Sequence, residues 1–176
     1  VKLMKKIVSV ILIAVVCCSL SACGIETSPK KEQYNASSVG SKTSGQEDYK
    51  INETAVFENI KVTATEIKES SGDEIFGPDE GNVFVGIKFV IENISEKSEL
   101  ISSLLLFDPY ADDVKCDYSL TANAEFGDGT LDGEIAPGKR MEGWYAVEVS
   151  SNWKKIDLDV KSSWLSGSSA RFVFEK

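Results

Sequence analysis

The chain contains no histidine, and positive charge is scarce beside 28 acidic residues. Without histidine, the usual general base near neutral pH is missing, together with every Ser-His or Cys-His catalytic pair. Phosphate-binding glycine loops, paired CxxC motifs and zinc-ligand spacings are also absent from the sequence. The composition therefore predicts that the protein is not an enzyme.

Cysteine is scarce as well, and its placement predicts no internal disulfide. Cys17 and Cys18 lie in an apolar N-terminal run, Cys23 ends that run, and Cys116 is the one cysteine in the rest of the chain. Because the chain has no imidazolium to lower a thiol pKa, we expect Cys116 to be a buried or half-buried structural residue rather than a reactive thiol.

The N-terminal run has the three parts of an export signal. Lys5 and Lys6 precede a continuous apolar core at residues 7–16, and small residues precede Cys23. The apolar stretch at 7–20 is shorter than the roughly 20 residues that a transmembrane helix needs. Leu20-Ser21-Ala22-Cys23 matches a lipid-modification box, in which the cysteine sulfur accepts diacylglycerol. We expect residues 1–22 to be a signal peptide and Cys23 to be lipidated, with plain secretory cleavage as the alternative.

Lipidation predicts both a location and a partner. Two or more acyl chains, at about 0.8 kcal/mol per buried methylene, hold a protein firmly on a membrane. We therefore expect the protein on the outer face of the cytoplasmic membrane of a Gram-positive-type bacterium. Loss of residues 1–22 removes three lysines and no acid, which leaves 16 basic against 28 acidic residues, a net charge of −12. Such a charge argues against nucleic acid as a partner.

Three segments follow from the composition. After the signal peptide, residues 23–50 are rich in Ser, Thr, Lys and Gly, which predicts a flexible linker with a reach of about 30 Å. Residues 51–176 show period-two alternation cut by turn residues. Strands are predicted at 55–67, 83–92, 104–107, 116–120, 130–135, 143–149, 156–160 and 170–174, with a helical turn as the alternative within 100–107. The fold class is all-β, with 51–176 forming one two-sheet sandwich.

Local signals support this organisation. Five apolar side chains share one face of the 83–92 segment, as in a central strand: Val83, Val85, Ile87, Phe89 and Ile91. Asn93 is expected to turn the chain by bonding the backbone two residues on. Pro137-Gly138 is expected to close a hairpin into the strand that begins at Gly143. Gly143 permits a bulge or a close backbone approach at the entry of this strand. Further turns are predicted at Gly77-Pro78, Asp108-Pro109, Asp128-Gly129 and Asp132-Gly133.

Three stretches carry a family resemblance: Val83-Phe84-Val85-Gly86-Ile87-Lys88-Phe89-Val90-Ile91-Glu92-Asn93, Ile135-Ala136-Pro137-Gly138-Lys139 and Gly143-Trp144-Tyr145-Ala146-Val147-Glu148-Val149. With Leu106-Phe107-Asp108 between them, they resemble the immunoglobulin-like domain of uncharacterised Gram-positive surface lipoproteins. That domain is similar in fold to mycobacterial immunoprotective extracellular antigens. The resemblance implies an immunoglobulin-like sandwich displayed outside the cell, and it implies no catalytic residue.

Two kinds of binding site are candidates. Exposed aromatic rings at strand ends or in loops could contact a glycan or a protein, and these are Tyr110, Tyr118, Trp153 and Trp164. Acidic loops could hold calcium, with Asp73, Asp79, Glu80, Asp128 and Asp132 as ligands, although no spacing matches an EF-hand. The simpler interpretations are that the rings pack at the edges of the sandwich and that the acidic residues keep the protein soluble. No other cofactor is expected.

Three functional hypotheses remain open. The first is a membrane-anchored binding or interaction module for a protein or cell-envelope ligand. The second is a passive structural or stress-related envelope lipoprotein without a ligand. The third is a hydrolase that uses two carboxylates, for instance among Asp112, Asp113 and Asp117, but a sandwich of this size has little room for a substrate cleft.

Overall fold

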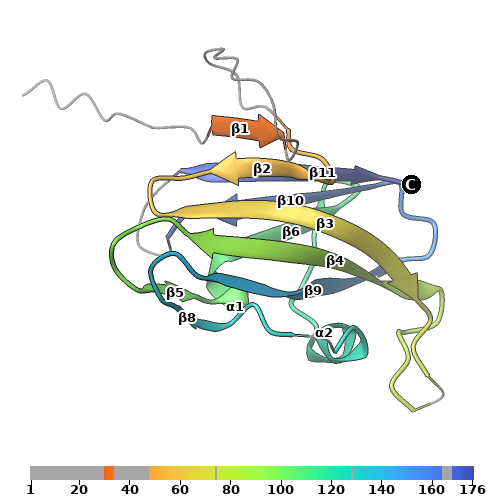
Figure 1. Ribbon diagram of the computed structural model, residues 1–176. Coiled ribbons are helices and arrows are strands. Elements are labelled where there is room, and N and C mark those ends of the chain that lie inside the picture. Colours follow the sequence, from red (N-terminus) through yellow and green to blue (C-terminus); the bar gives the residue numbers. More distant parts are fainter. Residues whose placement is uncertain (1–29, 34–47, 74, 128, 164–167) are drawn as a thin grey trace, which may run out of the picture.

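The chain forms a sandwich of two antiparallel sheets (Figure 1). The computed structural model describes residues 30–33, 48–73, 75–127, 129–163 and 168–176. The first sheet has the order β1 (Lys30–Gln33), β2 (Glu53–Val56), β3 (Ile60–Ser70), β4 (Asn82–Asn93) and β9 (Arg140–Ser150). The second has the order β11 (Ser169–Glu175), β10 (Lys155–Lys161), β6 (Phe107–Ala111) and β7 (Val114–Lys115). The remaining elements are the strand pair β5 (Glu99–Ile101) and β8 (Gly133–Ile135) and two short helices, α1 (Ser103–Leu106) and α2 (Leu120–Glu125). The predicted all-β, two-sheet sandwich is confirmed.

The core lies between the two sheets and is organised around β4. This strand pairs with β3 on one side and β9 on the other, so the predicted central position is confirmed. The apolar face predicted for residues 83–92 packs into the core, with Val83 only partly buried. The Phe89 ring meets the rings of Phe107 and Phe172 edge-on, with centroids 5.2 and 5.4 Å apart. These contacts join the two sheets.

The outer face of the first sheet carries a second, smaller cluster under α2. Phe84 is fully buried there with Ala122 of α2 and Ala146 of β9. Phe126, just after the helix, stacks on Trp144 at a centroid distance of 5.3 Å. A Cβ at Gly86 would lie 2.7 Å from the Phe126 ring, so glycine is needed at this position. The helix therefore forms a partial third layer, which the sequence does not predict.

Several predicted boundaries differ from the structure. The segment 55–67 divides into β2 and β3, joined by a turn in which the amide of Phe57 bonds the carbonyl of Ile60. The strand predicted at 116–120 is wrong, because no strand covers these residues and α2 begins at Leu120. The side chain of Ser119 caps this helix by accepting a bond from the Ala122 amide at 3.1 Å.

The turn predicted at Asp108-Pro109 is also wrong. Pro109 lies inside β6, opposite Leu158 of β10. The Pro109 carbonyl accepts a hydrogen bond from the amide of Cys116, the residue after the short strand β7. The Pro109 nitrogen faces the same side of β6 as this carbonyl. A proline is tolerated there because no ladder hydrogen bond requires its missing N–H.

The expectation for Asn93 is confirmed. Its Oδ1 atom accepts a bond from the Ser95 amide at 2.8 Å, and its Nδ2 atom donates to the carbonyls of Lys97 and Ile135, both at 2.7 Å. The side chain is fully buried. It thus fixes the turn after β4 and ties this turn to the end of β8.

The Pro137-Gly138 turn forms as expected, with Gly138 at a φ of 67°. However, β8 pairs with β5 while β9 pairs with β4, so the turn joins two sheets and does not close a hairpin. Of the two alternatives at Gly143, a bulge or a close approach, the structure shows the close approach, because a Cβ there would lie 2.8 Å from the backbone of Thr130.

The chain enters the sandwich along two sheet edges. The Tyr49 amide bonds the Arg171 carbonyl at 2.7 Å, and the Tyr49 carbonyl accepts from the Val173 amide at 2.8 Å, which seats Tyr49 beside β11. Lys30–Gln33, which fall in the predicted linker, instead pair with β2 as β1. Cys23 and the predicted signal peptide at residues 1–22 lie outside the described residues. Among the residues described, no helix has the length and hydropathy to cross a membrane.

Candidate functional site

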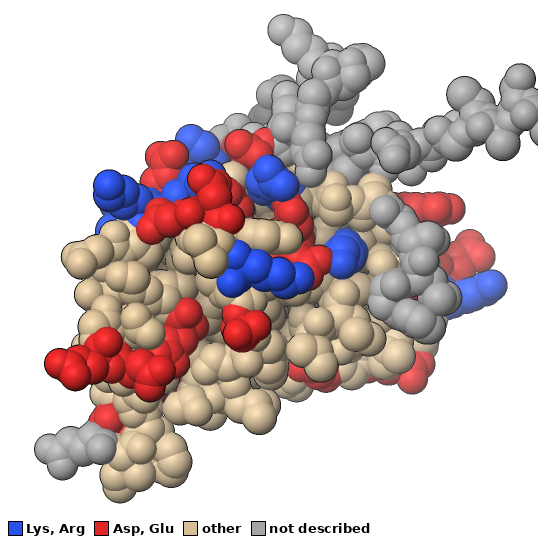
Figure 2. All heavy atoms as spheres, turned by 180° about the vertical axis from the view of Figure 1, so that it is seen from behind, with Lys and Arg blue, Asp and Glu red and all other residues tan. Residues whose placement is uncertain are grey.

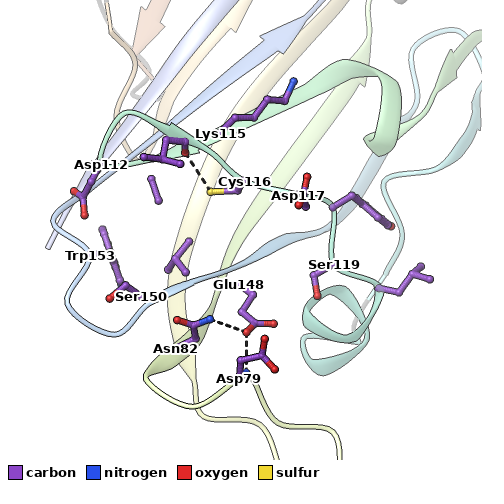
Figure 3. A pocket seen from close by; sticks show the side chains of 15 residues that line it. Asp79, Asn82, Asp112, Lys115, Cys116, Asp117, Ser119, Glu148, Ser150 and Trp153 are labelled. Atoms are coloured by element: carbon purple, nitrogen blue, oxygen red, sulfur yellow. Dashed lines mark hydrogen bonds between the residues drawn. The ribbon is translucent and has the colours of Figure 1, made fainter.

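An open groove lies between the edge strands of the two sheets, β9 and β7 (Figure 3). Its volume is about 770 Å³. We call it the β7–β9 groove. Its walls come from the β3–β4 loop, the end of β9, the β6–β7 hairpin and the segment before α2, and its lining residues are Asp79, Asn82, Ala111, Asp112, Val114, Lys115, Cys116, Asp117, Tyr118, Ser119, Leu120, Glu148, Val149, Ser150 and Trp153.

The β9 wall presents main-chain groups to this groove. The Asn123 side chain bonds the amide and the carbonyl of Ala146 at 3.0 and 2.9 Å, so the main chain of Ala146 faces away from β4. Bonding direction alternates along an antiparallel strand, so the main chain of Glu148 faces the same way. No described residue bonds the main chain of Glu148. Helix α2 therefore covers the β9 edge at Ala146 and leaves it open at Glu148.

The opposite wall is the β6–β7 hairpin. Asp112 and Asp113 form its two-residue turn, both with positive φ (48° and 68°), as in a type I′ turn. The Asp112 carboxylate accepts bonds from the amides of Lys154 and Lys155, at 3.1 and 3.0 Å. The Lys155 ammonium donates to Asp113 at 3.0 Å. These bonds fix the hairpin against the start of β10.

Part of the groove lining is continuous with the apolar core. Val149 and Trp153 belong to the core, and Tyr118 and Cys116 pack against it. The Cys116 thiol lies 3.8 Å from the Val114 carbonyl, as a weak donor. Burial raises the pKa of the Cys116 thiol, so it stays protonated near neutral pH. The predicted half-buried cysteine is confirmed, and this groove offers no activated thiol.

Charge around the groove is negative. Four lining residues carry carboxylates, against one lysine, Lys115, whose ammonium already pairs with Asp108 at 3.0 Å. Glu148 accepts bonds from the Asp79 amide at 2.8 Å and from the Asn82 side chain at 2.9 Å. In the rear view, acidic side chains gather at the lower left, above the protruding tip of the β3–β4 loop (Figure 2). The groove therefore favours a positively charged ligand.

Large apolar side chains border the groove and a second hollow beside it. Val114 and Leu120 line the groove, Phe76 lines the second hollow, and Ile75 precedes Phe76 in the β3–β4 loop. Their exposed fractions are 70, 76, 64 and 81%, and we call the four the apolar rim. The second hollow, of about 400 Å³, lies between the β3–β4 loop and α2, and Leu120 lines both spaces.

The β3–β4 loop is held in place by Asp73. Its carboxylate accepts bonds from the amides of Ile75 and Phe76, at 2.8 and 2.6 Å. These bonds, the Phe76 amide first, lower the pKa of Asp73. The loop thereby presents two adjacent apolar side chains to solvent.

The structure corrects one of the predicted aromatic contacts. Trp153 is 4% exposed, and its Nε1 atom donates to Glu69 at 2.8 Å, so the expectation of an exposed ring is wrong. Its apolar body fills the core while its N–H reaches a partner at the surface. Tyr110 and Tyr118 are half-buried, and of these two only Tyr118 lines the groove. Trp164 lies outside the described residues.

Among the described residues, the predicted acidic ligands lie in separate places. Asp73, Asp79 and Glu80 lie in the β3–β4 loop, whereas both oxygens of Asp132 bond Ser103 at the start of α1, at 2.8 and 2.9 Å. Asp128 lies outside the described part of the chain. Within that part, no group of three or more Cys, Asp or Glu side chains is placed to hold a metal ion.

The apolar rim is the feature that the sequence prediction missed. Ile75-Phe76 follows two acidic residues and precedes Gly77-Pro78, so two large apolar residues stand together in a turn-forming segment. That placement is the available signal. Val114 and Leu120 carried no such signal. Leu120 ended the strand predicted at 116–120, and Val114 lay in a segment without a predicted strand.

The chain matches a family over most of its length. Residues 49–170 match the family described as Domain of unknown function (DUF4352). The chain belongs to this family. The match begins at Tyr49, the residue that seats the incoming chain on β11, and ends within β11. The DUF4352 domain of this chain is thus the sandwich itself. No curated protein matches the chain.

Solved structures share the fold of this DUF4352 chain. ycdA of Bacillus subtilis, a candidate lipoprotein, has a TM-score of 0.56 at 13% identity, over 69% of this chain and 38% of its own. The yjhA protein of Bacillus subtilis has a TM-score of 0.55 at 18% identity, over 72% of this chain and 98% of its own. An uncharacterised β-sandwich protein of Clostridium difficile 630 has a TM-score of 0.50 at 16% identity, over 77% of this chain and all of its own. At these identities the likeness shows the fold alone. The predicted resemblance to Gram-positive β-sandwich proteins of unknown function is confirmed.

Proposed function

We propose that the protein is a lipid-anchored extracytoplasmic lipoprotein whose sandwich binds a protein or cell-envelope ligand at the β7–β9 groove. The anchor is supported by the lipid-modification box at Cys23 and by the description of the ycdA neighbour as a candidate lipoprotein. Localisation on the outer face of the cytoplasmic membrane follows from that anchor. The protein is not an enzyme in this proposal, because the groove contains no histidine and its thiol is protonated.

The apolar rim is the observation that carries the binding role. Val114 and Leu120 stand mostly in water in the lining of a groove with carboxylate-bearing walls, and the exposed Phe76 lines the hollow beside it, next to Ile75. An apolar surface bordered by polar groups is typical of interaction sites. The loop that presents Ile75 and Phe76 is itself held by hydrogen bonds, so the exposure is built into the fold.

Anchoring is tested by cell fractionation. The unaltered protein is expected in the membrane fraction, and Cys23→Ser is expected in the soluble extracytoplasmic fraction or the medium, because the thiol that accepts the lipid is gone. Equal membrane retention of both proteins contradicts the anchor.

Binding is tested by photo-crosslinking in cells. A photoreactive amino acid is placed at Leu120 in the rim or at Leu100 in β5, which is similarly exposed at 68% and does not line the groove. We expect a discrete adduct from position 120 and none from position 100. Digestion of the wall before electrophoresis separates a wall-glycan ligand from a protein ligand. The same adducts from both positions, or none from either, contradict a specific site.

A further inference from the structure

We propose that the β7–β9 groove binds an extended, lysine- or arginine-bearing segment of another polypeptide, which pairs with the free edge of β9 as an added strand. This inference rests on the proposed function and adds the class of ligand and the manner in which it is held.

The exposed main chain indicates a polypeptide ligand. The amide and carbonyl of Glu148 face the groove without a described partner. On the opposite wall, the Cys116 amide bonds Pro109, so the main chain of Lys115, one residue before it, faces away from β6. An extended peptide satisfies such groups by main-chain hydrogen bonds.

The chain shows this mode of pairing at another edge. Lys30–Gln33 form β1 by pairing antiparallel with β2 over four residues. A short segment with two lysines therefore already adds to the first sheet of this protein, on the side opposite β9. The β9 edge is the other end of that sheet.

The charges of the groove indicate a basic ligand. Asp79 and Asp117 are exposed lining residues, and Glu148 lies between them along the groove wall. Lys115, the lysine of the lining, is paired with Asp108. A segment with alternating basic and apolar residues would place its cations beside the carboxylates and its apolar side chains on Val114 and Leu120, because side chains alternate between the faces of a strand.

A second apolar patch, formed by Leu100, Leu104 and Leu105 near α1, does not support a similar proposal. Leu100 lies on β5, itself an edge strand, but nothing in the described part of the chain indicates what covers this patch. The β7–β9 groove combines apolar side chains, charge and an open edge.

The test uses residues 24–176, which include every described residue, and fluorescein-labelled peptides of six residues. A Lys-Val repeat is compared with a Glu-Val repeat and with a Lys-Val repeat N-methylated at alternate residues. Fluorescence anisotropy gives the dissociation constants. We expect the basic peptide to bind at least tenfold more tightly than the acidic one, and N-methylation to weaken binding at least fivefold. Equal binding of the N-methylated peptide overturns the added strand.

Matched charge reversals locate the site. Asp79→Lys with Asp117→Lys is expected to weaken binding of the basic peptide at least tenfold. Glu58→Lys with Glu96→Lys makes the same change in net charge at exposed residues outside the groove lining and is expected to weaken it less than twofold. Asp117→Lys alone is the second variant if circular dichroism shows that the double variant does not fold. Equal weakening by both double variants overturns the site.

The outcomes separate this inference from the proposed function. A crosslinked ligand at position 120 without binding of the basic peptide leaves the binding module in place and overturns the basic extended segment. If residues 24–176 self-associate, and Asp79→Lys with Asp117→Lys abolishes this association, then a second copy of the chain occupies the groove. This result also overturns the basic extended segment. Sedimentation equilibrium measures this association.

Discussion

At the residue scale, a few polar side chains hold the turns and strand ends that surround the core. Asn93 uses both ends of its amide on three backbone groups, and Asn123 uses its amide to cover the edge of β9. Asp112 and Asp73 hold loops by accepting backbone amides. Such side chains stabilise the fold because buried or turning backbone groups need partners.

Asn93→Ala is expected to lower the free energy of unfolding by about 2–4 kcal/mol, because it removes the donor to the buried Ile135 carbonyl together with the bonds to the Lys97 carbonyl and from the Ser95 amide. Urea denaturation measures the change. Asn152→Ala, at an exposed position, is the control and is expected to change stability by less than about 0.5 kcal/mol. If Asn93→Ala lowers the free energy of unfolding no more than Asn152→Ala does, water replaces the side-chain amide of Asn93 and the expectation is wrong.

Cys116 is expected to react slowly in the folded protein, because burial raises the pKa of its thiol. In residues 24–176, where it is the one cysteine, the reaction with a disulfide reagent at pH 8 should be at least tenfold slower without urea than in urea. A faster reaction in the folded state would identify an activated thiol and contradict the structural role.

Asp108 gives the stability a defined pH dependence. Its carboxylate bonds Lys161 and Lys115, and the Lys161 bond is the main cause that lowers its pKa. A lowered folded-state pKa stabilises the fold above the unfolded value of about 4, and this contribution is lost as the pH falls through the folded value. Asp108→Asn should therefore destabilise by about 0.2–1 kcal/mol per ion pair at pH 7, and the difference should vanish in strong acid. A difference that persists at low pH contradicts the ionic origin.

At the scale of elements, α2 protects a sheet edge. The first sheet ends at β9, and an exposed edge strand invites uncontrolled pairing. Asn123 of α2 pairs with Ala146 as a neighbouring strand would, while Phe126 anchors the end of the helix on Trp144. Beyond Ala146, the edge faces the groove at Glu148.

Asn123→Ala is expected to speed hydrogen exchange at the Ala146 amide at least tenfold, since this amide loses its acceptor. The Val147 amide faces β4 and provides an internal control that should change little. Equal acceleration at both amides would show that the whole strand loosens and that α2 has no local protecting role.

At the scale of the whole molecule, strands in which apolar and polar residues alternate were easier to predict than the helix that covers part of the first sheet. The β4 face, the turn at Asn93 and the close approach at Gly143 followed from the sequence because each depends on neighbouring residues. The α2 layer did not, since its short helix depends on Gly86 and Phe84, which are distant in sequence. Trp153 was predicted to be exposed because it lies between strands, but its ring reaches the core from that turn. The apolar rim arises from segments joined only in the folded sandwich.

The most direct test of the groove as the functional surface is to measure its accessibility in the cell. In a Cys116→Ala background, Leu120→Cys and Leu100→Cys are labelled with a small maleimide, on cells and in purified residues 24–176. Both positions are exposed, so the ratio of their labelling rates corrects for passage through the envelope. We expect the ratio of position 120 to position 100 to fall at least fivefold on cells, because a ligand covers the groove. An unchanged ratio would contradict the groove as a binding site.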